Sequence, residues 1–312
     1  MTLTQLEYIV AVDTHRQFVE AAESCFVTQP TLSMQIQKLE EALGVKIFDR
    51  TRHPVVPTPI GEKIIAQARV VLREAEHVKQ LIQEQQNIMS GEIRVGIIPT
   101  LSPYLLPSLF RNMQEKYPDV QLNVRETITE ELMQEIKNNR IDCGIVVTPL
   151  KNSLIREEVL FYEELFAYVS PRNELHEKKY VLPAEIDPRK LWLLEEGHCF
   201  RSQVLNLCEL RRQSDLQVRY ETGNIETLRR MVDKSDGITL LPELAVMELS
   251  KMQMKSVRKL KEPTPTREVS LVMHHDYFQT KLMKALKTEI MKVIPAHMLR
   301  ISKRKVIDVK GS

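Results

Sequence analysis

The sequence of 312 residues has only four cysteines, no ligand spacing typical of zinc sites and no long apolar run. Four cysteines are too few for the disulfide framework of a secreted domain, and neither a CxxC nor an HExxH pattern occurs. No stretch approaches the roughly eighteen apolar residues of a membrane-spanning helix. The N-terminus also lacks a basic segment followed by an apolar one. We therefore expect a cytoplasmic protein with no membrane partner, no metal and no cofactor.

The net charge of +2 is close to neutral and does not by itself indicate binding to nucleic acid. Such a function has to be argued from local patterns. A chain of this length exceeds what one hydrophobic core usually serves, so we expect two or three domains. Any disulfide in a cytoplasmic protein is expected to be transient rather than structural.

Residues 3–57 show the pattern of three short helices followed by a hairpin. Apolar residues recur at spacings of three and four in three successive segments, as on single helical faces. In the third segment Thr28 is the expected N-cap, Pro30 lies in the first turn and Gly44 ends the helix. Two β-prone runs around a basic turn follow. The pattern predicts a winged helix-turn-helix over residues 1–57, an architecture that binds double-stranded DNA.

The third helix presents polar side chains away from its apolar face, and two arginines lie on the wing. These groups can bond to base edges and phosphates, and an arginine can enter the minor groove. The predicted DNA contacts are Gln29, Thr31, Ser33, Gln35, Lys38, Arg50 and Arg52. The alternative is an ordinary solvated helical face.

Thr58 as N-cap and Pro59 at the first helical position predict a long helix that reaches Asn87, within a linker over residues 58–90. Its apolar and small residues alternate spacings of four and three, as in a seam for a partner helix. At 1.5 Å per residue the helix would be about 40 Å long. We expect it to serve dimerisation through Ile64, Ala68, Val71, Ala75, Val78 and Ile82.

From residue 91 onward, strand and helix patterns alternate. This predicts an α/β domain with layers around largely parallel sheets and enough elements for two lobes. The expected strands cover residues 93–98, 121–125, 143–147, 165–170, 191–194, 218–221, 238–241 and 268–273. The expected helices cover residues 105–116, 130–138, 225–234 and 279–293.

Cys199 and Cys208 lie in contrasting settings. Cys199 follows a strand beside His198 and Arg201, where positive charge and helix-terminal amides can favour the thiolate that attacks peroxide. Cys208 lies four residues after Val204 in a predicted helix and can pack in an apolar layer. If the segment is helical, the two Cα atoms are about 13 Å apart, whereas a disulfide tolerates about 4.4–6.8 Å. A bond between them would require the segment to refold.

The alternative is that both cysteines are buried independently, as we expect for Cys25 and Cys143. Spacing alone favours that alternative. Two roles are open for Thr100, because it follows a strand and precedes a helix. Its hydroxyl could hold a small polar molecule or cap the helix.

Residues 6–58 resemble the DNA-binding module of LysR-type transcriptional regulators. The resemblance is carried by Ala21-Ala22, the run VTQPTLS at 27–33, Ile36, residues 38–40 and 43–44, and Phe48-Asp49-Arg50. Later motifs resemble the peroxide-sensing members of that family as far as about residue 295. These are GIIPT at 96–100, PYLLP at 103–107, Gly197-His198-Cys199 with Cys208, ETLR at 226–229 and GITLLP at 237–242.

The resemblance implies the winged module at 1–57, the linker helix and hinge at 58–90, and a redox-sensing regulatory domain at 91–312. That domain would be of the type 2 periplasmic-binding-protein kind, with lobe one at 91–164 and 268–300 and lobe two at 165–267. Such regulators are usually homotetramers that bind promoter DNA and activate transcription by contacting RNA polymerase.

The resemblance also implies that hydrogen peroxide oxidises Cys199, which then pairs with Cys208 until cellular thiols reduce it. Thr100 would hold peroxide, while His198 and Arg267 would stabilise the thiolate or the leaving oxygen. Ser202 departs from the pattern, since an acidic residue is expected there in many relatives. Two alternatives remain. One is a regulator that binds an organic metabolite between its lobes, and the other is a thiol peroxidase, which would need no helix-turn-helix.

Overall fold

The computed structural model describes residues 1–85, 89–208, 222–261, 263–277, 280–300 and 305–307. The chain divides into two compact units, residues 1–88 with 137–140 and residues 89–136 with 141–312. Among the helices of these described ranges, none is both long and apolar enough to cross a membrane.

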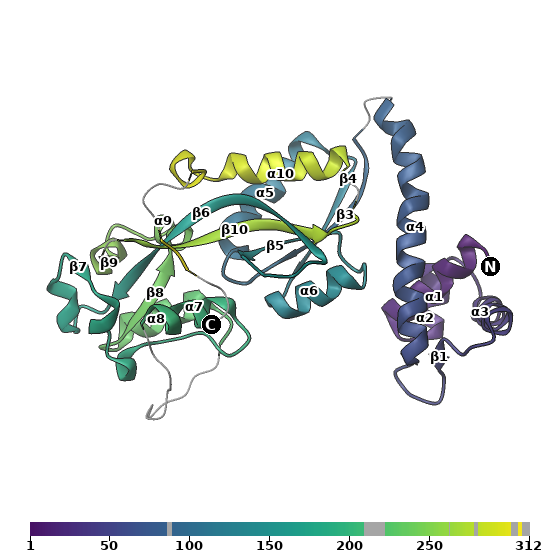
Figure 1. The fold of residues 1–312 in the computed structure, drawn as a ribbon, viewed down its shortest axis with the longest axis horizontal. Coiled ribbons are helices and arrows are strands. Elements are labelled where there is room, and N and C mark those ends of the chain that lie inside the picture. The colour runs from purple at the N-terminus through teal and green to yellow at the C-terminus, as the bar shows by residue number, and fades with distance from the viewer. Residues whose placement is uncertain (86–88, 209–221, 262, 278–279, 301–304, 308–312) are drawn as a thin grey trace. The chain divides into compact units, whose positions relative to one another are not determined.

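The N-terminal unit contains the predicted helices and wing (Figure 1). Its helices are α1 (Leu3–His15), α2 (Phe18–Ser24), α3 (Gln29–Leu43) and α4 (Pro59–Gln85), and its strands are β1 (Phe48–Asp49) and β2 (Val56–Pro57). The two strands pair antiparallel and form the wing. Gly44 ends α3 in the left-handed conformation. The winged helix-turn-helix prediction is confirmed.

Side-chain hydrogen bonds cap α4 and hold the wing to α3. Thr58 Oγ1 accepts the Gly61 amide at 3.0 Å, so Thr58 caps α4 as predicted. Thr28 holds the N-cap position of α3, but its hydroxyl bonds to the Thr31 hydroxyl and not to a backbone amide. Buried Glu40 accepts the amide of Ile47 at 2.8 Å and thereby fastens α3 to the wing.

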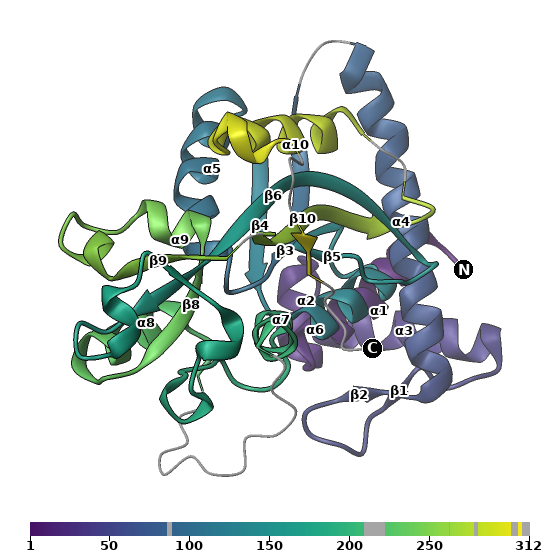
Figure 2. The same ribbon diagram turned by 60° about the vertical axis from the view of Figure 1, so that its left-hand side comes forward.

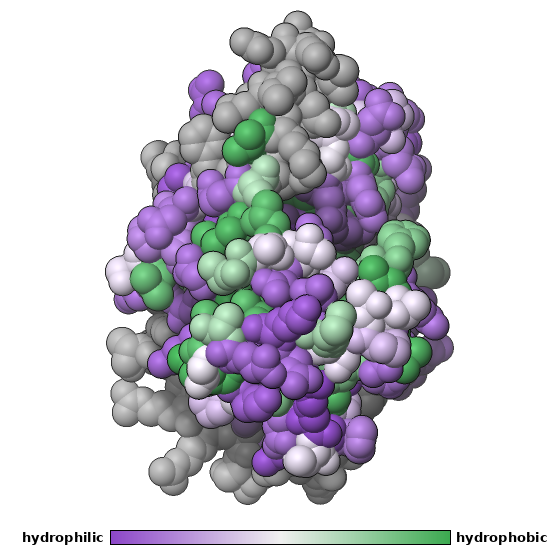
Figure 3. All heavy atoms as spheres, turned by 90° about the vertical axis from the view of Figure 1, so that its right-hand side faces the viewer, coloured by the Kyte–Doolittle hydropathy of each residue, from purple (hydrophilic) through white to green (hydrophobic). Residues whose placement is uncertain are grey.

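Part of the seam predicted on α4 packs against the core of the N-terminal unit itself. Ala68 is 2% exposed in the core of this unit, because α1 packs along α4 and covers it. Ile64 and Val71 also pack against this core, and the expectation that Ala68 faces a partner helix is wrong. Val78 is 61% exposed and Ala75 partly so, whereas the side chain of Ile82 lies outside the described part. Figure 3 shows the face of the molecule that lies on the right in Figure 1, and apolar and hydrophilic side chains are mixed on this face.

The C-terminal unit is built on a mixed sheet. Its strands are β3 (Gly91–Ile97), β4 (Val120–Glu126), β5 (Cys143–Thr148), β6 (Ile155–Val169), β7 (Tyr180–Val181), β8 (Ile238–Pro242), β9 (Val257–Leu260), β10 (Pro265–His274) and β11 (Lys305–Val306). Their order is β4-β3-β5-β10-β6-β9-β7, with β8 on β6 and β11 on β10. Only β3–β4, β3–β5, β7–β9 and β10–β11 pair in parallel among the described strands. The expectation of largely parallel sheets is wrong, because the long strands β6 and β10 run antiparallel to each other through the centre (Figure 2).

The helices of this unit are α5 (Ser102–Lys116), α6 (Thr129–Lys137), α7 (Cys199–Leu207), α8 (Ile225–Lys234), α9 (Glu243–Met247) and α10 (Lys281–Val293). In both ribbon views α5 and α10 lie on one side of β6 and β10, and α6 lies on the other. The strand expected at 165–170 is the second half of the longer β6. Residues 191–194 contribute only one isolated bridge, and the strand expected at 218–221 falls outside the described residues.

Two separate hydrophobic cores give this unit its two lobes. The first gathers β3, β5, the first half of β6, most of β10, α5 and α10. The second gathers the other half of β6 with β8, α7 and α8. The chain is thus an α/β protein with a winged helix-turn-helix, a long linker helix and a two-lobed regulatory domain, as predicted.

Candidate functional site

A small pocket lies where the turns after β3 and β4 meet the start of α7. Its lining residues are Ile98, Pro99, Thr100, Ile128, Thr129, His198, Cys199 and Phe200. The carboxyl ends of parallel strands are the usual place for a ligand in an α/β sheet. The empty volume is about 180 Å³ with open solvent included. Because this volume includes open solvent, the space that the lining residues enclose is smaller still and suits only a molecule of a few atoms.

Cys199 is the first residue of α7, and its side chain is only partly exposed. Gly197, with φ of 92°, gives the chain the left-handed turn that brings Cys199 to this position. The Thr129 hydroxyl donates to Cys199 Sγ at 3.6 Å. Burial raises the pKa of Cys199, against the lowering effects of the Thr129 hydrogen bond, the Arg267 charge and the amides at the start of α7.

Two cations were expected near Cys199, Arg201 from the local sequence and Arg267 from the family resemblance, and the structure favours Arg267. The Arg201 guanidinium donates to the Leu194 carbonyl at 2.8 Å, and the cation that lowers the pKa of Cys199 is Arg267. His198 is buried and lines the pocket, with its Nε2 3.5 Å from Glu195 Oε1. Because burial dominates, the resting site favours the thiol more than the sequence alone predicts.

Arg267 lies behind Thr100 and does not line the pocket itself. Its side chain is fully buried, and its Nε donates to Glu163 Oε2 at 2.6 Å. Nη1 donates to Thr100 Oγ1 at 3.0 Å, and Nη2 donates to the Thr100 carbonyl at 3.2 Å. Leu101 is the N-cap of α5, so Thr100 does not cap this helix. Since its oxygen already accepts from Arg267, the Thr100 hydroxyl keeps its own proton to donate.

Two residues of the site were not predicted. Thr129 is the third residue after β4, just as Thr100 is the third residue after β3, and this shared position was a signal that the sequence contained. Glu163 is the buried partner of Arg267, and burial raises its pKa against the lowering effect of the Arg267 charge. Glu163 lies in a strand pattern beside Glu164, and no feature of the sequence distinguished it as a site residue.

Cys208 follows the last residue of α7 and lies in the core of lobe two. It is 5% exposed, and burial raises its pKa to about 12. The segment from Cys199 to Leu207 is helical, and the Cys208 amide donates to the Val204 carbonyl at 3.0 Å. The apolar setting predicted for Cys208 is confirmed, and the separation of about 13 Å follows from the helical rise. All four cysteines are free thiols.

The residues predicted to contact DNA differ in their exposure to solvent. Gln29 and Lys38 are exposed, whereas Thr31, Ser33 and Gln35 are partly exposed on α3. Arg52 is 71% exposed at its side chain and lies 3.4 Å from Asp49. Arg50 instead donates to Ser33 Oγ at 2.9 Å and stacks over the Phe18 ring at 4.8 Å. Arg50 therefore holds the wing against α3, and it also lies near the surface of the wing.

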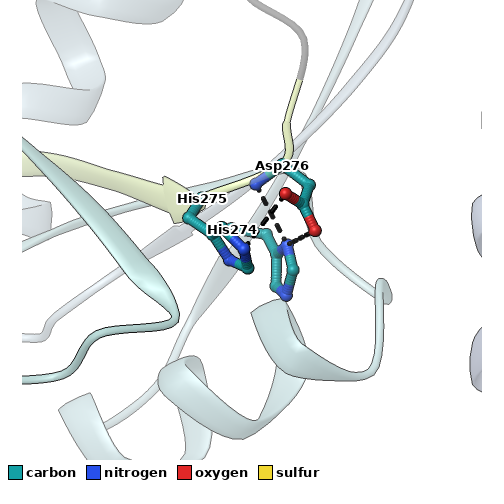
Figure 4. Close-up of side chains that lie close together, drawn as sticks. All are labelled: His274, His275 and Asp276. Carbon is teal, nitrogen blue, oxygen red and sulfur yellow. Dashed lines mark hydrogen bonds and ion pairs between the residues drawn. The ribbon is translucent and has the colours of Figure 1, made fainter.

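His274, His275 and Asp276 lie together where β10 ends (Figure 4). Their candidate ligand atoms all lie within 4.8 Å of one another. The Asp276 carboxylate is 3.0 Å from His275 Nε2, and its amide donates to His274 Nδ1 at 3.3 Å. These groups satisfy one another, and we assign them no role.

Comparison with known proteins identifies the family. Residues 3–62 match the bacterial regulatory helix-turn-helix protein of the lysR family, and residues 86–294 match the LysR substrate binding domain. This chain belongs to the LysR family. A LysR regulator binds DNA to control transcription and is not an enzyme, so the thiol peroxidase alternative is wrong.

Relatives of this LysR regulator include the DNA-binding transcriptional dual regulator OxyR of Escherichia coli K12. The two are 36% identical over 272 residues, which cover 87% of this chain and 89% of that protein. The hydrogen peroxide-inducible genes activator of Haemophilus influenzae is 35% identical, with 87% and 90% covered. A full-length OxyR C199D from Pseudomonas aeruginosa has a similar structure, with a TM-score of 0.80, 32% identity and coverage of 93% and 98%.

Proposed function

We propose that this LysR regulator senses hydrogen peroxide at Cys199 and is switched by a reversible disulfide between Cys199 and Cys208. It would act mainly as an activator of oxidative-stress genes. The observation that carries the proposal is that Cys199, a partly exposed residue, lines a pocket for a molecule of a few atoms, with the Thr129 hydroxyl 3.6 Å from its sulfur. The small volume weighs against an organic metabolite at this position.

The residues of the pocket supply the requirements of the first step. The thiolate of Cys199 attacks one peroxide oxygen, the O–O bond breaks, and the other oxygen leaves as hydroxide to give a sulfenic acid. The Thr100 hydroxyl can hold peroxide by donating to it, because Arg267 occupies its acceptor side. His198 and Arg267 would stabilise the thiolate and the leaving oxygen. In the second step the Cys208 sulfur attacks the sulfenic sulfur, and water leaves.

The second step couples chemistry to conformation. Cys208 is buried in lobe two, and α7 holds the two sulfur-bearing residues about 13 Å apart. A disulfide requires Cα atoms about 4.4–6.8 Å apart. The α7 segment would therefore have to unwind, remove Cys208 from its core and refold. Such a rearrangement is a two-state change that oxidation can drive.

The proposal includes the working context of the regulator. The winged module at 1–57 would bind double-stranded promoter DNA, the linker at 58–90 would join protomers, and the domain at 91–312 would sense peroxide. Lobe one would span 91–164 and 268–300, and lobe two 165–267. A homotetramer in the cytoplasm would contact RNA polymerase, and cellular thiol reductants would restore the free cysteines.

Thiol mapping tests the proposal directly. The reduced protein is exposed to a small excess of peroxide, free thiols are trapped and peptides are mapped by mass spectrometry. We expect a Cys199–Cys208 bond, also in a Cys143→Ser control. If both thiols stay free in a folded protein, the redox proposal fails. Cys199→Ser should abolish the peroxide-dependent change in a promoter footprint, and a persisting change would exclude Cys199 as the sensor.

A further inference from the structure

The C-terminal segment adds a short strand to the sheet beside the redox site. β5 pairs with β10 only as far as Thr148, which lies opposite Glu268. The edge of β10 before that point is taken by β11, which pairs in parallel and sets Val306 opposite Thr266. The Ile307 amide then donates to the Thr266 carbonyl at 2.9 Å. Pairing of this kind is a common way for an extended peptide to dock on a sheet edge.

The same segment contacts the helix between the two redox cysteines. Ile307 is 8% exposed and belongs to the lobe-two core that contains Val204 and Cys208. The Gln203 side-chain amide donates to the Ile307 carbonyl at 3.4 Å. Gln203 is fully buried in α7, and its Oε1 has no hydrogen-bond partner in the part of the chain that is described. Glutamine is rarely buried, and here its amide is directed to the C-terminal segment.

We propose that residues 305–307 form a clamp that holds α7 in its helical state. The docking surface consists of the part of the β10 edge that β5 leaves unpaired, Gln203 and the apolar core of lobe two, and its occupant is the chain's own C-terminal strand. Arg267, which bonds to Thr100, directly follows Thr266 in β10. The clamp therefore contacts both the neighbour of Arg267 in β10 and Gln203 in α7. This inference rests on the proposed function, in which α7 must unwind before Cys208 can reach Cys199.

The clamp has a measurable consequence in the reduced protein. Full burial of an isoleucine side chain corresponds to about ten- to hundredfold in an equilibrium constant. Loss of the Ile307 contact should raise the population in which α7 is open by about that factor. Opening exposes the Cys208 thiol, which is 5% exposed in the closed state. The rate of Cys208 alkylation thus reports how often α7 opens.

The test uses a full-length Cys199→Ser protein without peroxide. Iodoacetamide labelling of Cys208 is followed over time and separated from labelling of Cys25 and Cys143 by peptide mass spectrometry. We compare Ile307→Ser, a chain that ends at Arg304, and Val306→Ser as a control in the same strand. Cys208 labelling should rise at least about tenfold in the first two variants and stay within about twofold in the control. An unchanged rate in the folded Ile307→Ser protein overturns the clamp.

Smaller changes at Ile307 test the clamp in proteins that are less prone to misfold than Ile307→Ser. Ile307→Val and Ile307→Ala remove progressively more buried surface, so the labelling rates should rise in that order. A flat series also overturns the clamp. Because alkylation involves no peroxide, this result is independent of the redox proposal. Absence of a peroxide-induced disulfide would defeat the proposed function while leaving the labelling measurement valid.

Discussion

Arg267 donates to both oxygen atoms of Thr100, to the hydroxyl at 3.0 Å and to the carbonyl at 3.2 Å. The guanidinium thereby fixes the Thr100 side chain in one orientation from within the protein, and a third bond to Glu163 at 2.6 Å fixes the guanidinium. The Thr100 hydroxyl is left as a donor toward the pocket. The orientation of Thr100, which the proposed function assigns to holding peroxide, thus depends on a residue that does not line the pocket.

Thr100→Val should slow the reaction of Cys199 with peroxide. The change removes the donor to peroxide, and one hydrogen bond of about 0.5–1.5 kcal/mol corresponds to roughly two- to tenfold in rate. It also leaves a buried Arg267 nitrogen without its acceptor, so the free energy of unfolding should fall by about 1–3 kcal/mol. Stopped-flow oxidation and urea unfolding measure the two effects. Thr100→Ser keeps the hydroxyl and serves as control, and equal rates in all three proteins would contradict the role.

Thr129→Val should raise the pKa of Cys199 further. The Thr129 hydroxyl donates to the sulfur and lowers a pKa that burial raises, so its loss leaves burial less opposed. The thiolate fraction at neutral pH then falls, and the pH profile of Cys199 alkylation shifts to higher pH. Peptide-resolved labelling between pH 6 and about 10 measures this shift. Thr129→Ser should retain the parent profile, and a Thr129→Val profile that overlays it would remove Thr129 from the site.

Cys208 should make the reduced fold less stable at high pH. Its pKa in the folded protein is about 12, above the ordinary value of 9.0, because burial disfavours the thiolate. A group whose pKa is raised on folding contributes stability that is fully present below its unfolded pKa. This contribution is lost as pH rises from about 9 toward 12, by about 1.4 kcal/mol per unit. Urea unfolding of the parent should show this extra decline relative to Cys208→Ala. Parallel pH curves for the two proteins would contradict the burial.

Gly61→Ala should destabilise the DNA-binding module. A Cβ at this position would lie 2.0 Å from the Ile47 carbonyl oxygen, so α4 and the wing could not keep their present spacing. Overpacking of this kind costs about 1–3 kcal/mol or more. Thermal unfolding followed by circular dichroism measures the loss, with the exposed neighbour change Glu62→Ala as control. Equal melting temperatures for Gly61→Ala and the control would show that the backbones can separate freely.

The two wing arginines should respond differently in DNA binding. Arg52 is exposed, so Arg52→Ala should weaken binding across sequences and lower the slope of log K against log salt by about 1. Arg50→Ala should weaken binding and also reduce thermal stability, because Arg50 contacts Ser33 and the Phe18 ring. Fluorescence anisotropy at several salt concentrations measures the slopes. An unchanged slope for Arg52→Ala would exclude a phosphate contact there.

Local sequence patterns were sufficient to predict those elements whose formation depends on residues close to them in the sequence. Spacing of apolar residues, Thr58 at a cap and Gly44 at a helix end located the helix-turn-helix and the linker helix. The same reasoning failed for the sheet, because the direction in which β6 and β10 pair is set by contacts between distant residues. It also failed for Ala68, since only the packing of α1 shows which side of α4 is already covered.

The sequence by itself determined the family and the helix that separates Cys199 from Cys208, and it indicated the proposed redox pair only through the family resemblance. The two cysteines lie within ten residues, so helical rise alone sets the distance between them. Only the tertiary structure decided what surrounds them. The cation that lowers the pKa of Cys199 is Arg267, which only the family resemblance had indicated. Its partner Glu163 lies 104 residues away, and Ile307 packs in the core that buries Cys208. Electrostatics and burial act through space, so these assignments required the folded chain.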